Sequence, residues 1–107
     1  MLYKFRSKAA GDVIMTSGVG DAILRLMGRE PTAQGIFTPE QMPALIALLE
    51  AAVADDEQRR AEAVAEARAE GRLLPPREGV TLRQRAWPLV EMLRRAQAAE
   101  RDIVWGA

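Results

Sequence analysis

The stretch MLYKFRSKAAGDVIMT, residues 1–16, decides the fold class of this chain. Tyr3 and Phe5 alternate with basic residues, and this two-residue period is typical of a strand with one buried face. Residues 8–12 contain Gly and Asp, which suit a chain reversal, and residues 13–15 are a short run of strand-forming type. We therefore predict an antiparallel hairpin at the start of the chain.

Three later segments have the three-to-four-residue apolar spacing of amphipathic helices. The first predicted helix starts near Val19 and ends at Gly28. The second starts at Thr38-Pro39-Glu40-Gln41 and the third at Thr81-Leu82-Arg83-Gln84, and both starts have the spacing of a capping box. The Pro75-Pro76 pair predicts a loop between the second helix and the third.

The apolar face of the second helix stops before its helical propensity does. That face consists of Met42, Leu45, Ile46, Leu49, Ala52 and Val53. Beyond Val53 the same face presents charged residues, whereas Ala, Glu and Arg keep helical propensity high to about Glu70. We predict that residues 54–80 form a charged helical extension and a Pro-rich loop, with Leu73 and Leu74 as anchors on the core.

These elements predict one α+β domain that covers residues 1–107. A small, mostly antiparallel sheet is expected from residues 2–7, 12–16 and 102–105, with about three helices packed on one face. The two ends of the chain should meet in that sheet. Residues 36–37 form either an edge strand or an apolar plug before the second helix.

The composition excludes much of enzyme chemistry. The 107 residues include no His and no Cys. The chain therefore lacks thiolate nucleophiles, imidazole bases, and the metal sites that depend on either group. The acidic run 55–57 cannot converge on one ion, because consecutive helical residues point about 100° apart. We expect no catalytic residue, no cofactor and no bound metal.

The charges sum to zero but are unevenly distributed. Residues 1–37 carry a net charge of +2, residues 38–71 carry −5, and residues 72–107 carry +3. The simplest interpretation is that the acidic middle lies against the basic ends within the fold. The longest apolar run has six residues, against roughly 20 needed to span a bilayer, so we expect no membrane association and a cytoplasmic location.

Two sets of residues are candidates for binding. Ser17, Gly18 and Gly20 stand between a predicted strand and a predicted helix, where backbone N–H groups attract anions, although the complete dinucleotide and phosphate-loop patterns are absent. Arg83, Trp87 and Arg94 lie within about 60° of one another on the last helix and form a candidate partner surface. The alternative is that these arginines pair with the acidic middle helix.

Three stretches of the sequence carry a family resemblance. They are residues 1–15, the Arg83-Gln84-Arg85-Ala86-Trp87-Pro88 segment, and Ile103-Val104-Trp105-Gly106. Together they resemble the family of small Gram-negative bacterial proteins called domain of unknown function 1840. The resemblance implies a compact cytoplasmic bacterial domain and assigns no activity, cofactor or catalytic residue.

We expect a noncatalytic protein-interaction or regulatory module, whose partner is another protein or a second copy of the chain. Two alternatives are open. The first is weak nucleic-acid binding through the Arg/Trp helix, which the sequence pI of about 6.3 disfavours. The second is an anion-binding protein or enzyme that uses the turn at residues 17–21.

Overall fold

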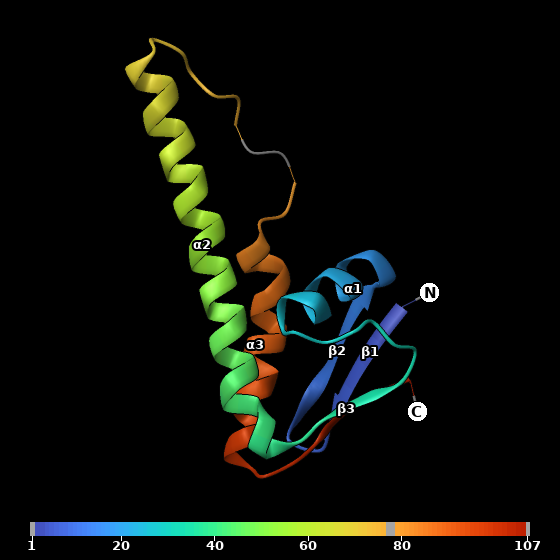
Figure 1. Cartoon of the computed structure of the whole chain (residues 1–107). Coiled ribbons are helices and arrows are strands. Elements are labelled where there is room, and N and C mark those ends of the chain that lie inside the picture. The colour runs from blue at the N-terminus through green and yellow to red at the C-terminus, as the bar shows by residue number, and fades with distance from the viewer. Residues whose placement is uncertain (1, 77–78, 107) are drawn as a thin grey trace.

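The structure is a computed structural model that describes residues 2–76 and 79–106. It confirms the predicted α+β class (Figure 1). The elements in chain order are β1 (Leu2–Ser7), β2 (Ala10–Thr16), α1 (Ser17–Leu26), β3 (Gly35–Phe37), the 3-10 turn η1 (Pro39–Gln41), α2 (Met42–Ala69), α3 (Leu82–Ala98) and β4 (Ile103–Trp105).

The sheet is antiparallel with strand order β2-β1-β4-β3. The two chain ends meet in it as predicted, because Arg6 of β1 pairs with Val104 of β4. Residues 35–37 pair with β4, so the short apolar segment before the second helix is an edge strand. The hairpin reverses at Lys8 and Ala9, earlier than we predicted, and Gly11 lies within β2.

Three aromatic side chains join β1, β3 and β4. Phe5, Phe37 and Trp105 are fully or almost fully buried, and the Trp105 ring centroid lies 4.7 Å from that of Phe37 and 5.4 Å from that of Phe5. The Trp105 Nε1 group donates to the Thr32 carbonyl oxygen at 3.1 Å, so the buried indole keeps no unsatisfied donor.

The helices cover one face of the sheet and bury the predicted apolar stripes. In α2 the buried residues Leu45, Leu49 and Val53 face the core, and Leu89 and Leu93 do so in α3. The predicted start of α3 is confirmed: Thr81 N donates to Gln84 Oε1 at 2.9 Å, and Gln84 N donates to Thr81 Oγ1 at 3.2 Å. The α-helical part of the second helix begins at Met42, after η1.

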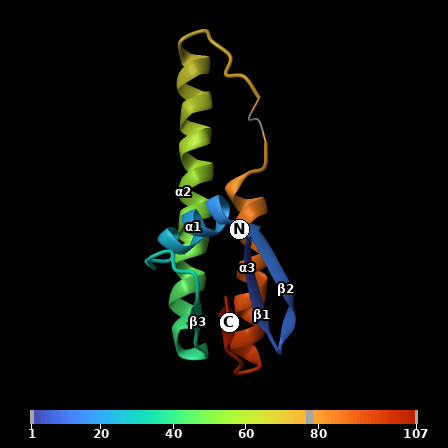
Figure 2. The same cartoon turned by 90° about the vertical axis from the view of Figure 1, so that its right-hand side faces the viewer.

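The other face of the sheet has no helix over it in the described part of the chain (Figure 2). We call it the bare face. Leu2, Ile14 and Ile36 lie there and are 66%, 58% and 43% exposed. The strand pairs Lys4 with Ile14, Arg6 with Val104, and Ile36 with Val104 place the remaining members: the bare face comprises Leu2, Lys4, Arg6, Ile14, Thr16, Ile36 and Val104.

The distal half of α2 extends beyond the core. After Val53 its only fully buried residue is Ala67 (Figure 1). Residues 70–76, which we call the returning segment, follow the helix, and the Pro75 carbonyl oxygen accepts a hydrogen bond from Arg60 of α2 at 2.8 Å. The radius of gyration is 16.0 Å, against about 13 Å for a compact domain of this length. Our prediction that Leu73 anchors the loop is wrong, because that side chain is 88% exposed, whereas Leu74 is half-buried.

Two glycines of α1 provide a matched test of this packing. A Cβ atom on Gly20 would lie 2.0 Å from the Tyr3 ring, whereas one on Gly18 would meet nothing within 4 Å. We expect Gly20→Ala to lower the free energy of unfolding by about 1–3 kcal/mol, because the aromatic ring must move. Gly18→Ala should raise it by about 0.5 kcal/mol through reduced backbone entropy of the unfolded chain. Urea titrations of both variants measure the difference, and equal effects would contradict the close packing of α1 on the Tyr3 ring of β1.

Candidate functional site

The three residues of the predicted partner surface come together on α3. The guanidinium carbon of Arg83 lies 5.2 Å from the centroid of the Trp87 ring, and that of Arg94 lies 5.1 Å from it. These distances fit cation–π contacts. Trp87 is half-buried against the core, so the indole holds the two arginines along the side of α3.

Both arginines also pair with acidic residues of α2, as the charge distribution predicts. Arg83 donates to the two carboxylate oxygens of Glu57 at 3.0 and 2.8 Å, and this contact raises the pKa of Arg83. Arg94 donates to Glu50 at 3.1 Å and to Glu91 at 3.0 Å. Because the side chains of every pair are about half exposed, each pair contributes little to stability. The Arg83–Glu57 and Arg94–Glu50 pairs help to fix how α3 lies on α2, whereas Arg94 and Glu91 both belong to α3.

The residues of the predicted anion-binding turn lie at the start of α1. Strand β2 runs directly into α1 at Ser17, so Ser17, Gly18 and Gly20 belong to the first turn of the helix. Ser17 and Gly18 are exposed, whereas Gly20 is buried beneath the ring of Tyr3. The close approach of this ring explains why a glycine stands at position 20. The three residues therefore do not form one loop around a ligand.

Ser17 lines a hollow of about 270 Å³ together with Tyr3 and Asp21. The Tyr3 hydroxyl donates a hydrogen bond to a carboxylate oxygen of Asp21. This bond is the largest cause of the raised pKa of Tyr3, and burial and the Asp21 charge act in the same direction. A negatively charged carboxylate at the wall repels anions, so the chemistry of this hollow does not favour an anion.

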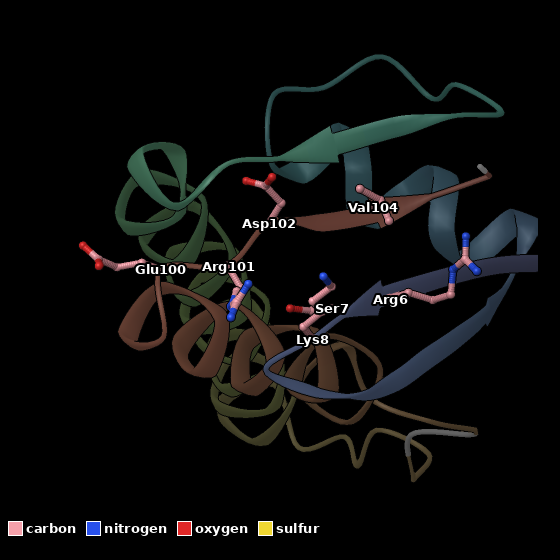
Figure 3. Close-up of a pocket in the computed structure, with 7 residues that line it drawn as sticks. All are labelled: Arg6, Ser7, Lys8, Glu100, Arg101, Asp102 and Val104. Atoms are coloured by element: carbon pink, nitrogen blue, oxygen red, sulfur yellow. The ribbon is translucent and has the colours of Figure 1, made fainter.

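A larger hollow of about 470 Å³ lies where the β1–β2 turn meets the turn from α3 into β4 (Figure 3). Its charged lining residues have both signs, and the Glu100 carboxylate points away from the other labelled side chains. The lining residues are Arg6, Ser7, Lys8, Glu100, Arg101, Asp102 and Val104. Sequence reasoning did not find this hollow, because its two sides lie more than 90 residues apart in the chain.

Glu100 has an unusual backbone conformation for a residue with a side chain. All three helices end with the same bond, in which the N–H of Arg29, Arg72 or Arg101 donates to a carbonyl five residues earlier. The residue before that donor is glycine in α1 and α2, but it is Glu100 in α3, with φ of +56°. This left-handed conformation costs a non-glycine residue about 1 kcal/mol or more.

The bare face is the candidate interface of the molecule. Ile36 and Val104 pair across β3 and β4, and Arg6 pairs with the same Val104 from β1, so apolar and cationic groups adjoin in one row. On β1 the basic Lys4 pairs with Asp12 at 3.5 Å. One sequence signal could have indicated this face: the run Val13-Ile14-Met15 lies in a strand and must place apolar side chains on both sides of the sheet.

Three further findings concern the described residues alone. Residues 2–76 and 79–106 hold no group of three or more acidic side chains placed to bind a metal ion. Within the same ranges, no helix combines the length and apolar character that crossing a membrane requires. No buried side-chain nitrogen or oxygen there lacks a hydrogen-bond partner.

The family comparison matches almost the whole chain. The model of the family described as "Domain of unknown function (DUF1840)" matches residues 1–105. No curated protein and no solved structure is similar enough to this chain to be matched.

The left-handed residue at the end of α3 predicts a stabilising substitution. We expect Glu100→Gly to raise the free energy of unfolding by about 1 kcal/mol, because glycine adopts a positive φ without steric cost. Gly28→Ala and Gly71→Ala, at the matching positions of α1 and α2, should each lower it by a similar amount. Thermal unfolding of the three variants gives the comparison, and a destabilised Glu100→Gly variant would show that the carboxylate is needed for stability.

The bond between Tyr3 and Asp21 predicts a loss of stability in alkali. The folded-state pKa of Tyr3 is raised above its unfolded value of about 10, so the stabilisation is complete below that pH and is lost as the pH rises through the folded-state pKa. Tyr3→Phe should lower the free energy of unfolding at pH 7 by about 1 kcal/mol, because the hydrogen bond is removed. Urea unfolding between pH 7 and 11 should show that the difference in free energy of unfolding between wild type and variant becomes smaller above pH 10. A difference that stays constant across this range would exclude the linkage.

Proposed function

The chain belongs to the family described as domain of unknown function 1840, and we propose that it is a noncatalytic protein-interaction module. The observation that carries this proposal is the bare face: one side of a four-stranded sheet presents Leu2, Ile14 and Ile36 to solvent. Ile14 and Ile36 lie on the two edge strands, and the residues between them are Lys4, Arg6 and Val104. An exposed sheet face that mixes apolar and polar groups in this way is typical of protein contact surfaces.

The composition and the charges of the bare face support this proposal. Without His and Cys the chain has few groups for acid–base or nucleophilic catalysis near neutral pH. The bare face joins its apolar residues to charged ones, among them Arg6 and the Lys4–Asp12 ion pair, and this combination suits a protein partner with both apolar and polar groups. A cysteine-free chain also suits a reducing compartment, so we include a cytoplasmic location in the proposal.

The two alternative functions have less support. Nucleic-acid binding through the predicted surface of Arg83, Trp87 and Arg94 requires free cationic side chains. Both of these arginines are engaged by carboxylates, Arg83 by Glu57 and Arg94 by Glu50 and Glu91. An anion-binding function at residues 17–21 requires an electropositive pocket, and the neighbouring hollow contains the Asp21 carboxylate. Neither alternative accounts for the exposed apolar groups of the sheet.

The proposal is tested by a single charge placed on the bare face. Full-length wild-type protein and the Ile36→Lys variant are used as bait in cells of the source organism, and co-purified proteins are quantified by mass spectrometry. We expect at least one protein to be recovered about tenfold less with the variant, because a lysine replaces an apolar contact at the interface.

The matched control is Leu73→Lys, which makes the same change at an 88% exposed apolar residue on the returning segment. It should capture the same proteins as wild type. Both variants must first show wild-type thermal unfolding. If captured proteins are insensitive to Ile36→Lys, or equally sensitive to Leu73→Lys, the bare face is not the interaction surface.

A further inference from the structure

The outer edge of β2 has no neighbouring strand in the described part of the chain. Edge strands expose rows of unpaired N–H and C=O groups, and natural proteins usually protect them with charges, prolines or bulges. In β2 the only charged residue is Asp12, and residues 13–16 contain neither a charge nor a proline. This half of the edge is open to another extended chain.

A groove runs along this edge, between β2 and α3. Its volume is about 190 Å³, and both its walls are partly apolar. Val13 and Gly11 form the strand side, and Met92 with the ring of Pro88 forms part of the helix side. A Cβ atom on Gly11 would meet nothing within 4 Å, so the strand backbone is accessible there. The full lining is Ala10, Gly11, Val13, Pro88, Glu91, Met92 and Arg95.

The two charged residues of the groove differ in whether they have an ion-pair partner. The Glu91 carboxylate accepts a hydrogen bond from Arg94 at 3.0 Å. Arg95 is exposed, and its guanidinium makes no hydrogen bond or ion pair with any residue in the ranges 2–76 and 79–106. The groove therefore offers an unpaired cation at the side of an open strand edge, and a carboxylate would complement it.

We propose that this groove binds an extended, carboxylate-bearing segment of a partner protein, which joins the sheet as a fifth strand beside β2. Main-chain hydrogen bonds to the β2 edge would hold the segment, as in other cases of strand addition. Alternate side chains would point toward Val13 and Met92 on one face and cover Ile14 on the other. A carboxylate of the segment would pair with Arg95. This inference rests on the proposed interaction function and names the chemistry of the partner.

The charge of the groove favours such a segment over a second copy of the chain. A second copy that paired through the same edge would bring another Arg95 with it, whereas an acidic segment supplies the missing charge. The exposed Ile14 side chain fits the same arrangement, because an added strand places its own side chains directly opposite those of β2.

The experiment uses a displayed library of random octapeptides, selected on the full-length protein. We expect the enriched peptides to have apolar residues at alternate positions and at least one acidic residue. The same selection on Arg95→Glu should replace the acidic residue with a basic one. A synthetic peptide chosen from the wild-type selection should bind Arg95→Glu about tenfold more weakly and Arg95→Gln with an intermediate loss.

The matched control is Arg85→Glu, the same change at an exposed arginine of α3 that does not line the groove. It should bind the peptide like wild type. Strand addition also predicts that the alternate amides of residues 11–16 that point away from β1 become protected from hydrogen exchange when the peptide is bound. Thermal unfolding of each variant establishes that it is folded.

Several outcomes overturn the inference. They are the absence of enriched peptides, a selection that Arg95→Glu does not change, unchanged exchange of the β2 amides, and a dimer in light scattering whose outward β2 amides are already protected without peptide. These failures are distinct from failure of the proposed function, because Ile36 lies on β3, at the opposite edge of the sheet. Partner loss in Ile36→Lys without peptide selection would support the interaction function at the bare face and exclude the groove beside β2 as its site.

Discussion

The contact of Trp105 with Phe5 and Phe37 is the interaction on which the rest of the structure depends. It joins strands from the first, middle and last parts of the chain, so the central pair β1 and β4 is held by side chains as well as by main-chain bonds. A Cβ atom at Gly35 would lie 2.1 Å from the indole ring, so the tryptophan packs directly on the backbone of β3. The helices then pack on the surface that these rings create.

This arrangement explains why the two faces of the sheet differ. The large rings all point to the side that α2 and α3 cover, and the alternation of strand side chains leaves smaller apolar and charged groups on the other side. Covering the other face would require a second layer of helices. The residues that could form one lie instead in the distal half of α2, which extends away from the sheet. The bare face and the long α2 therefore have the same cause: the helical residues of this chain lengthen one helix and do not form a second layer.

Much of this fold could be predicted because its signals are local. The alternation at Tyr3 and Phe5, the two Thr-x-x-Gln helix starts, and the end of the apolar stripe at Val53 each depend on neighbours within one or two turns. The pairing of basic α3 with acidic α2 could be predicted from the net charges of the two segments alone. The charged hollow, the groove beside β2 and the burial of Gly20 could not be predicted, because each depends on which distant segments meet. The sequence alone does not show that the Tyr3 ring packs on Gly20, whereas Gly18 has open space around it.

The distal half of α2 and the returning segment contribute almost nothing to the core, and this leaves their length unconstrained by packing. Related chains could lose or gain about seven residues, close to two helical turns, in the distal half of α2. With a matching change in the segment between α2 and α3, the sheet would keep its shape. The tip near Gly71 is thus a natural position for inserted sequence. A fluorescent or affinity module placed there would report on the protein while both edges of the sheet stay untouched.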